Sequence, residues 1–329
     1  MTGTQREFDI VVYGATGFVG KLTAEYLARA GSSARMALAG RSTDRLKAVR
    51  ETLGESAQSW PLLTADASSP STLNAMAAQS QVLITTVGPY SRYGLPLVAA
   101  CAAAGTDYAD LTGEAMFVRN SIDLHHKQAA DTGARIVHAC GFDSIPSDLN
   151  VYALYRTVTE DGTGELGKTD LVVRFSGGLS GGTIASGMEM MHTASSDSEA
   201  RRQVNDPYTL STDRAAEPDF GPQPDLPWRR GRDIAPELAG TWTAGFLMAP
   251  YNTRIVRRSN ALLDGAYGRQ LRYTEHMKVG SSFVAPAASA LITGAENTIF
   301  GLGNRYFRLL PRQLVERLAP KVGTGPGEA

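Results

Sequence analysis

Short apolar runs alternate with amphipathic segments through the first 140 residues of the chain. The run at 8–13, FDIVVY, is almost continuously apolar, as in a strand buried on both faces of a parallel sheet. The segment 17–30 then places Phe18, Leu22 and Tyr26 four residues apart, on one face of a helix. The further strand and helix pairs that this alternation predicts lie at 34–40 and 43–54, 60–66 and 69–79, 82–88 and 95–105, and 106–111 and about 117–132, with a last strand at 134–140.

Strands and helices in this order need crossover connections, which produce a parallel sheet with helices on both faces. We therefore predict an α/β fold built on a doubly wound parallel (Rossmann) sheet. A chain of 329 residues suits two domains, and the alternation stops after 140–150. We expect a dinucleotide-binding Rossmann domain over 1–150 and an α+β substrate or dimerisation domain over 151–329.

The second half of the chain has a less regular pattern. Residues 206–240 contain six prolines and predict an irregular stretch. The elements expected around this stretch are strands at 169–176, near 241–249 and near 270–279, and a helix at 183–196.

A glycine-rich turn separates the first strand from the first helix. In GATGFVG, Gly14 permits the tight turn, Gly17 lets the backbone approach a pyrophosphate, and Gly20 permits close packing of helix on strand. The N–H groups at the start of the helix would then hold the pyrophosphate. The alternative is a glycine turn that serves packing alone. The loop residues expected to bind the dinucleotide are Gly14, Ala15, Thr16, Gly17, Phe18 and Gly20.

The end of the second strand indicates which dinucleotide binds. An NAD enzyme places an acidic residue there against the ribose, whereas this chain has Arg41 and Ser42. The planar guanidinium of arginine suits a 2′-phosphate, so we predict NADP(H). The alternative is that Arg41 is a solvated cation at the end of a strand.

Two later strand ends complete the expected cofactor site. Asp66, after the third strand, is placed to meet the adenine end, and an acidic helix cap is the alternative. Gly88, Pro89 and Tyr90 end the fourth strand, where the nicotinamide half passes in such folds.

Several motifs in the first 150 residues resemble those of the saccharopine dehydrogenase-like oxidoreductases: GATGFVG, AGR, VGPY with a glycine four residues on, GTDYADLTGE and GFDSIPSD. Within that family the chain looks most like the trans-acting enoyl reductases that serve modular polyketide synthases. The segments 181–191 and 252–262 look like the same branch. The resemblance implies NADPH-dependent reduction of a carbon–carbon double bond conjugated to a thioester or carbonyl, on a long acyl chain. Relatives continue for several tens of residues beyond this chain, so we expect the family's final segment to be missing.

Enoyl reduction needs a donor for the developing oxyanion and a proton for the α-carbon. The candidates at strand ends are Tyr90, Glu114 and Asp143, the last beside Ser144. The alternatives are ring stacking for Tyr90, and helix capping or an interdomain strut for Glu114 and Asp143. The histidines lack the spacing of metal ligands, so no metal site is predicted.

Charge and cysteine content indicate the setting of the protein. Cys101 and Cys140 lack the pattern of a zinc site or a secreted scaffold, and the N-terminus lacks a leader, so we expect a cytoplasmic protein. Residues 226–329 hold 14 Lys and Arg against 7 Asp and Glu. This basic part could be a solvated surface, or it could meet an acidic acyl-carrier domain or anionic lipid. Nucleic acid is not expected, because the net charge is −1 and no recognition motif occurs.

The apolar segment 281–303 predicts a buried or amphipathic helix, because polar residues and Pro286 interrupt it. Peripheral contact with the inner face of a membrane and a homodimer are further expectations. Arginines that would favour such an anionic surface flank the segment: Arg254, Arg257, Arg258, Arg305, Arg308 and Arg312.

Three functions remain open from the sequence. The first is an NADPH-dependent enoyl reductase of lipid metabolism that acts on an acyl thioester carried by a polyketide synthase. The second keeps the cofactor but reduces an imine or ketone, as in saccharopine reduction. The third is a non-catalytic NADP(H)-binding protein associated with a membrane.

Overall fold

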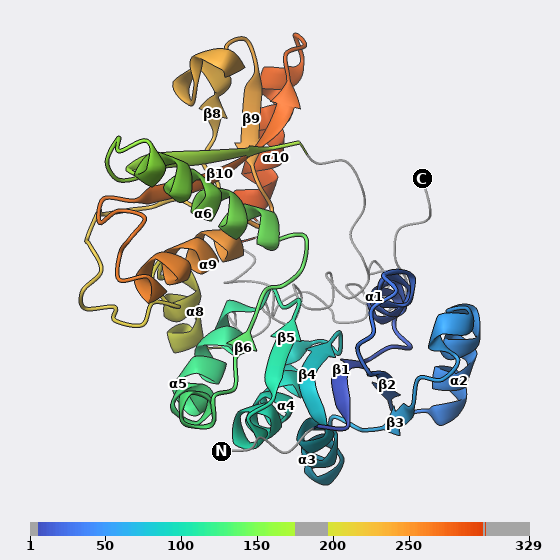
Figure 1. The fold of residues 1–329 in the computed structure, drawn as a ribbon. Coiled ribbons are helices and arrows are strands. Elements are labelled where there is room, and N and C mark those ends of the chain that lie inside the picture. Colours follow the sequence, from blue (N-terminus) through green and yellow to red (C-terminus); the bar gives the residue numbers. More distant parts are fainter. Residues whose placement is uncertain (1–5, 175–196, 299, 301–329) are drawn as a thin grey trace. The chain divides into compact units, whose positions relative to one another are not determined.

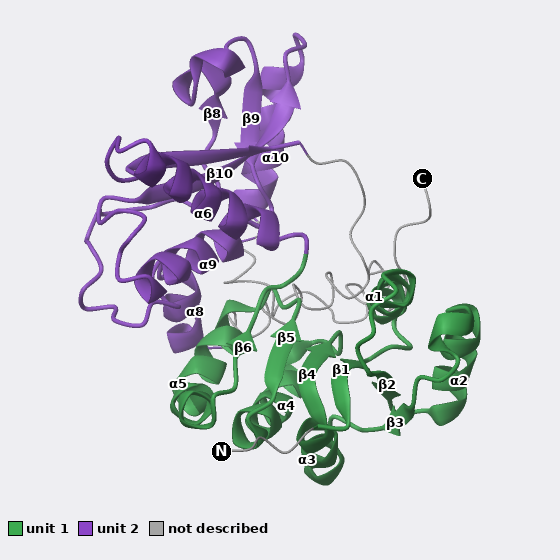
Figure 2. Cartoon of the chain, viewed as in Figure 1, with its two compact units in different colours: residues 1–141, 179–187, 319–329 green, residues 142–178, 188–318 purple. Residues whose placement is uncertain are grey.

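The computed structural model describes residues 6–174, 197–298 and 300 of the chain. These residues divide into two compact units (Figure 2). Residues 6–141 form the first unit, and the remaining described residues form the second. The helix expected at 183–196, the segment 181–191 and the arginines after residue 300 lie outside the described residues.

The first unit contains a six-stranded sheet in the order β3-β2-β1-β4-β5-β6, and every neighbouring pair is parallel (Figure 1). This arrangement confirms the predicted doubly wound sheet. The chain moves outward from β1 to β3 and then returns to the other side of β1, so the direction of winding changes between β1 and β4. Its strands are β1 Phe8–Tyr13, β2 Met36–Gly40, β3 Leu62–Thr64, β4 Ser80–Thr85, β5 Asp107–Asp110 and β6 Ile136–Val137.

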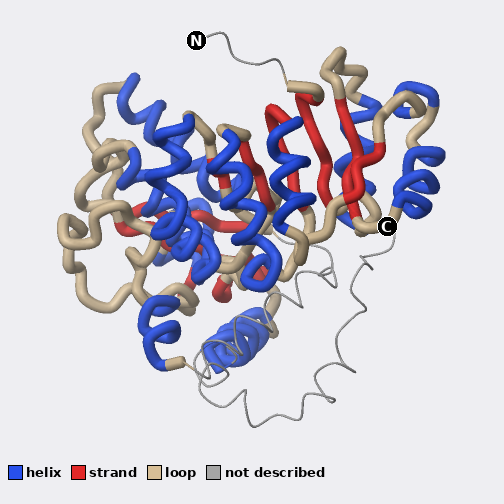
Figure 3. The backbone as a smooth tube through the Cα atoms, turned by 90° about the horizontal axis from the view of Figure 1, so that it is seen from below, coloured by secondary structure: helices blue, strands red, loops and turns tan. Residues whose placement is uncertain are grey.

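Helices cover both faces of this sheet (Figure 3). Helices α1 and α2 share one apolar cluster with β1 and β2, whereas α3, α4 and α5 pack side by side. The helices of the unit are α1 Phe18–Arg29, α2 Thr43–Thr52, α3 Pro70–Gln79, α4 Tyr90–Ala104 and α5 Ala115–Thr132, with a short 3₁₀ turn at Glu55–Ala57.

The buried face of α1 differs from the apolar face expected from the sequence. Leu22 and Tyr26 are 49% and 72% exposed, while Gly20, Ala24 and Ala28 are buried. A Cβ atom at Gly20 would overlap the carbonyl group of Gly14. Small residues therefore face the sheet because the helix lies too close to β1 for larger side chains.

The second unit is a mixed α+β assembly, as predicted. Its sheet has the order β7-β10-β9-β8, in which β7 and β10 are parallel and the other pairs are antiparallel. Its strands are β7 Lys168–Val173, β8 Arg229–Arg230, β9 Trp242–Gly245 and β10 Arg272–Gly280. Its helices are α6 Ile145–Glu160, α8 Ser198–Asn205, α9 Ala249–Leu262 and α10 Ala285–Asn297, with 3₁₀ turns at Gly231–Asp233 and Pro236–Leu238.

Helix α10 lies within the apolar segment 281–303 and packs on β9. Its buried positions include Ser289 and Thr293, whereas Leu291 is 76% exposed. The Ser289 hydroxyl donates to the carbonyl of Thr243, and the Thr293 hydroxyl accepts the N–H of Gly245. The helix thus uses polar side chains to bond to an adjacent strand. Within the described residues, no helix combines the length and apolar character needed to cross a membrane.

Glu296 is the one acidic residue on the buried face of α10. Its side chain lies beside Gly245 and Leu226, and its Oε2 atom has no hydrogen-bond partner among the described residues. Burial raises the pKa of Glu296 to about 7. The folded protein therefore holds this proton more tightly than the unfolded chain does.

Stability is expected to fall as pH rises toward neutrality because of Glu296. The folded-state pKa lies above the unfolded value of 4.5, so its favourable contribution is complete below pH 4.5 and is lost as pH rises through about 7. Between pH 5 and 8 the native chain should lose about 2–3 kcal/mol more unfolding free energy than Glu296→Gln, measured by urea denaturation. Glu237→Gln, on an exposed residue, is the control and should follow the native chain. Parallel pH profiles for the native chain and Glu296→Gln would contradict this assignment.

Candidate cofactor and active site

The turn after β1 has the shape that a dinucleotide loop requires. Gly14 has a φ of 89°, and a Cβ atom there would lie 2.7 Å from Oγ1 of Thr86. The Gly14 carbonyl accepts hydrogen bonds from the Gly17 N–H at 2.9 Å and from the Thr86 hydroxyl at 3.2 Å. Gly17 is the N-cap of α1 and has no side chain to cap the helix, so N–H groups of the first turn remain available to bind an anion.

Arg41 and Ser42 lie where β2 ends and α2 begins. Arg41 is exposed, and the Ser42 hydroxyl accepts the N–H of Arg45 at 3.4 Å as the cap of α2. A hydroxyl that accepts a hydrogen bond keeps its own proton, so Ser42 can still donate to a phosphate. The pair therefore offers a guanidinium and a hydroxyl beside a helix N-terminus, which suits a 2′-phosphate.

Asp66 forms a turn ahead of α3. Its Oδ1 atom accepts the N–H and the hydroxyl of Ser68, at 2.8 and 2.6 Å. These two bonds hold the pKa of Asp66 below its usual value, and the Arg41 guanidinium makes a smaller contribution in the same direction. Asp66 is thus ionised near Arg41, and its Oδ1 atom already accepts the hydrogen bonds from Ser68.

Tyr90 begins α4, immediately after the cis peptide bond between Gly88 and Pro89. Its side chain is only 4% exposed, and its hydroxyl donates to the Thr85 carbonyl at 3.1 Å. The ring packs against that of Phe117, with centroids 5.6 Å apart. The Tyr90 hydroxyl is therefore engaged inside the unit.

Glu114 connects two of the motifs recognised in the sequence. Its two carboxylate oxygens accept the N–H groups of Tyr90 and Ser91, each at 2.8 Å, so it caps the start of α4. One turn further along α4, a Cβ atom at Gly94 would overlap the ring of Phe117 on α5. VGPY with its following glycine and DLTGE therefore form one packed corner, which explains both motifs by structure.

Asp110 organises a second buried cluster that the sequence reasoning missed. Its carboxylate accepts the Tyr108 hydroxyl at 2.9 Å and lies 2.7 Å from Nδ1 of His138. The other ring nitrogen, Nε2, lies 2.9 Å from the hydroxyl of Ser121. All these side chains are buried, and the aspartate, histidine and serine join β5 and β6 to α5. The DLTGE motif was the available signal for Asp110. The described residues contain no group of acidic, histidine or cysteine side chains suited to a metal ion.

GFDSIPSD leads into α6 of the second unit. The Asp143 side chain is exposed, whereas its carbonyl accepts the Asn252 amide at 2.9 Å. Asn252 also accepts the Ser144 hydroxyl at 2.9 Å and lies 3.1 Å from the Ser147 hydroxyl. Asn252 therefore fixes the first turn of α6 from α9, a role that sequence reasoning did not assign.

Glu275 on β10 belongs to the same hydrogen-bonded cluster as Asn252. One carboxylate oxygen lies 3.1 Å from the Asn252 amide, and the other accepts the Tyr273 hydroxyl at 2.8 Å. Both Asn252 and Glu275 are fully buried, and burial raises the pKa of Glu275.

Three arginines expected at a basic surface are instead internal or bonded to loops. Arg254 is 2% exposed and pairs with Asp225 at 2.7 Å. Arg257 is 5% exposed and donates to Gln223 at 3.1 Å, and Arg258 donates to the carbonyl of Leu210. These bonds attach the proline-rich stretch to α9, and burial removes Arg254 and Arg257 from the anionic-lipid surface expected from the sequence.

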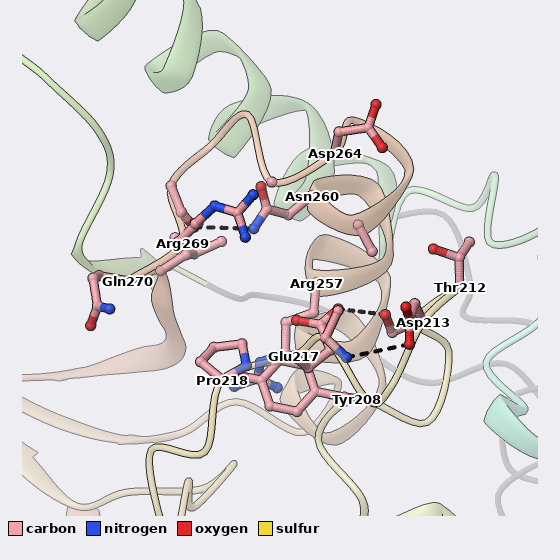
Figure 4. A pocket seen from close by; sticks show the side chains of 16 residues that line it. Tyr208, Thr212, Asp213, Glu217, Pro218, Arg257, Asn260, Asp264, Arg269 and Gln270 are labelled. Carbon is pink, nitrogen blue, oxygen red and sulfur yellow. Dashed lines mark hydrogen bonds between the residues drawn. The ribbon is translucent and has the colours of Figure 1, made fainter.

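A pocket of about 490 Å³ opens beside α9 (Figure 4). Tyr208, Asp213, Glu217, Arg257 and Arg269 contribute to its wall. The acidic groups are partly engaged, since Glu217 accepts the Ser211 hydroxyl and Asp213 accepts backbone N–H groups. Apolar and polar surface contribute about equally to this wall.

The comparison with known families identifies the first unit. Residues 10–137 match the family described as the saccharopine dehydrogenase NADP binding domain. Together with the doubly wound sheet and the glycine turn, this match defines the chain as an NADP-dependent oxidoreductase.

Longer relatives, of which this chain covers 78–79%, define the branch. The chain is 68% identical to a trans-acting enoyl reductase of Mycobacterium bovis, over 99% of this chain and 78% of the relative. It is 67% identical to a trans-acting enoyl reductase of Mycobacterium ulcerans, over 100% of this chain and 79% of the relative. A relative in Mycobacterium tuberculosis is 74% identical, also over 100% of this chain and 79% of the relative. The chain belongs to the trans-acting enoyl reductase branch of the saccharopine dehydrogenase-like oxidoreductases.

Among solved structures, the chain resembles apo saccharopine dehydrogenase from Saccharomyces cerevisiae with a TM-score of 0.40 and 19% identity, over 50% of this chain and 34% of that chain.

The capping role of Glu114 predicts a loss of stability when the carboxylate becomes an amide. In Glu114→Gln one oxygen is replaced by an NH₂ group that faces a backbone N–H, which should cost about 1–3 kcal/mol of unfolding free energy. Urea denaturation would measure this loss, and Glu51→Gln, on an exposed residue of α2, should cause almost none. A variant with native stability but slow turnover would instead indicate proton transfer by Glu114.

Proposed function

We propose that the protein reduces the carbon–carbon double bond of an enoyl thioester on a long-chain polyketide or lipid intermediate, with NADPH as the reductant. The observation that carries this proposal is 67–68% identity, over nearly the whole chain, to proteins named trans-acting enoyl reductases. The first unit would bind the cofactor and the second would supply the substrate site, in line with the domains expected at 1–150 and 151–329.

Bound NADPH supplies the hydride, which goes to the β-carbon of the enoyl group. The cofactor-binding role is proposed for Gly14, Ala15, Thr16, Gly17, Phe18, Gly20, Arg41, Ser42, Asp66, Gly88, Pro89 and Tyr90. The uncapped start of α1 and the exposed Arg41 support this assignment, since they offer donors to a pyrophosphate and a 2′-phosphate.

Negative charge develops on the thioester oxygen during hydride transfer, and a proton then reaches the α-carbon. Of the three proposed catalytic residues, Tyr90 and Glu114 are buried and hydrogen-bonded to their own unit, and Asp143 has an exposed side chain. We propose that Tyr90 and Glu114 act chiefly by holding the β4–α4 turn, and that Asp143 is the first residue to test as proton donor.

We propose an acyl-carrier domain of a polyketide synthase as the partner that presents the substrate. A reducing cytoplasm is the proposed location, because both Cys101 and Cys140 are free thiols.

A substrate panel tests the proposed reaction. NADPH oxidation, followed by the absorbance of the reduced nicotinamide, should occur with an α,β-unsaturated acyl thioester and not with a ketone or an imine precursor. Oxidation with the imine or ketone would favour saccharopine-like chemistry. Tight NADPH binding without oxidation of any of the three would favour a non-catalytic protein.

Arg41 should set the preference between the two nicotinamide cofactors. Arg41→Ala removes the proposed partner of the 2′-phosphate, so the Kd for NADPH should rise about 10- to 100-fold while that for NADH changes little. Fluorescence titration would measure both constants. Lys47→Ala removes an exposed cation further along α2 and should leave both unchanged. Equal losses for NADPH and NADH would exclude this role for Arg41.

A further inference from the structure

Exposed arginines and aromatic rings gather at the β8–β9 edge of the second unit's sheet, which lies next to α10 (Figure 1). Arg230 on β8 pairs in register with Trp242 on β9, and Trp242 also pairs with Gly280 at the end of β10. We call this group the arginine–tryptophan surface: Trp228, Arg230, Arg232, Trp242 and Phe283.

The two tryptophans form a fixed platform. Their rings stack with centroids 5.3 Å apart and an angle of 28°. The Trp228 indole N–H donates to the Ser289 hydroxyl at 2.7 Å, and that hydroxyl donates in turn to Thr243. Trp228 is nevertheless 46% exposed. A large ring held in place while facing solvent loses little conformational entropy when a partner covers it.

Arg230 adds a charge to this platform. Its guanidinium carbon lies 5.3 Å from the centroid of the Trp242 ring, and no ion pair to Arg230 occurs among the described residues. Arg232 is exposed, and its Nε atom lies 3.9 Å from Oδ1 of Asp233. The Nε atom of Arg229 is buried without a hydrogen-bond partner among the described residues. A guanidinium stacked on an indole keeps its edge free to bind a carboxylate with two parallel hydrogen bonds.

Two other cations lie nearby on the opposite face of the sheet. Arg229 and Lys278 both pair with Thr243, the neighbour of Trp242 on β9, so their side chains leave the sheet on the face opposite to Trp242. The acids near this edge are Asp233 and Glu237. Phe283 comes three residues after Gly280, the partner of Trp242, and is 95% exposed. The combination of tryptophan, arginine and an exposed phenylalanine is typical of the centre of a protein interface.

We propose that the arginine–tryptophan surface docks a small acidic protein domain, the carrier that presents the acyl thioester. This inference rests on the proposed function. Carboxylates of the carrier would bind the edges of Arg230 and Arg232, and an apolar side chain would cover Trp228 and Phe283. An anionic membrane is the weaker fit, because the surface exposes two arginines, Arg230 and Arg232, whereas lipid-binding clusters usually hold 4–8 basic residues, and the Trp228 N–H is already used internally.

The test compares the same enoyl group with and without a carrier protein. The first substrate is the enoyl group on a polyketide synthase acyl-carrier domain, and the second is the same group on pantetheine, which has no protein. Arg230→Glu should raise KM for the carrier-bound substrate about 10-fold or more and leave kcat/KM for the pantetheine thioester within about 2-fold. The carrier-dependent rate of the native chain should also fall with added salt, and that of the variant should fall less.

Arg156→Glu is the matched control, because it reverses the charge of an exposed arginine on α6, a helix that packs on α9. It should leave both substrates unaffected. Circular dichroism and thermal unfolding of each variant separate a folding defect from a docking defect. Trp228→Ala is a second variant that changes no charge, and it should also raise KM for the carrier-bound substrate while leaving kcat/KM for the pantetheine thioester nearly unchanged.

Equal losses with both substrates, or no loss with the carrier, would overturn the proposal. Release of Arg230→Glu from vesicles of phosphatidylcholine and phosphatidylserine, with normal use of the carrier, would show a membrane surface instead. If the native chain reduces neither substrate, the proposed function fails. Fluorescence anisotropy of the labelled carrier domain then decides the docking proposal, which requires binding by the native chain that Arg230→Glu loses.

Discussion

The close approach of α1 to the end of β1 is the constraint on which the cofactor site depends. Gly20 lies against the Gly14 carbonyl with no room for a Cβ atom, and the left-handed conformation of Gly14 turns the chain into the helix. This contact brings the uncapped N-terminus of α1 to the carboxyl end of β1, beside the point where the sheet reverses its winding. Donors for a pyrophosphate therefore gather at the place where a doubly wound sheet binds its ligand.

Buried polar side chains hold the remaining strand ends in place. Glu114 caps α4, Asp110 joins β5 and β6 to α5, and Asn252 with Glu275 fixes the first turn of α6. Each of these groups is buried and hydrogen-bonded, so removal of one partner would leave a desolvated polar group. The motifs shared with the family are thus explained largely by bonds between elements distant in sequence.

The cations of the second unit divide into two groups with different roles. Arg254 and Arg257 are buried and attach the proline-rich stretch to α9, where they cannot attract a partner. Arg230 and Arg232 are exposed at the sheet edge, and Arg230 lies on an indole ring. A basic composition alone does not distinguish these cases, because burial and pairing decide whether a charge acts inside the protein or at its surface.

The sequence by itself determined the order of strands and helices, the doubly wound class and the dinucleotide turn, because apolar periodicity and glycine placement are local properties. It also singled out Glu114 and Asp143, but it left capping and catalysis open for both. Only the tertiary structure decided that Gly20, Ala24 and Ala28 form the buried face of α1. Likewise, only the fold brought Asn252 to Asp143 and Glu114 to Tyr90, since such pairs are 109 and 24 residues apart and no local pattern records which long-range partner a polar side chain meets.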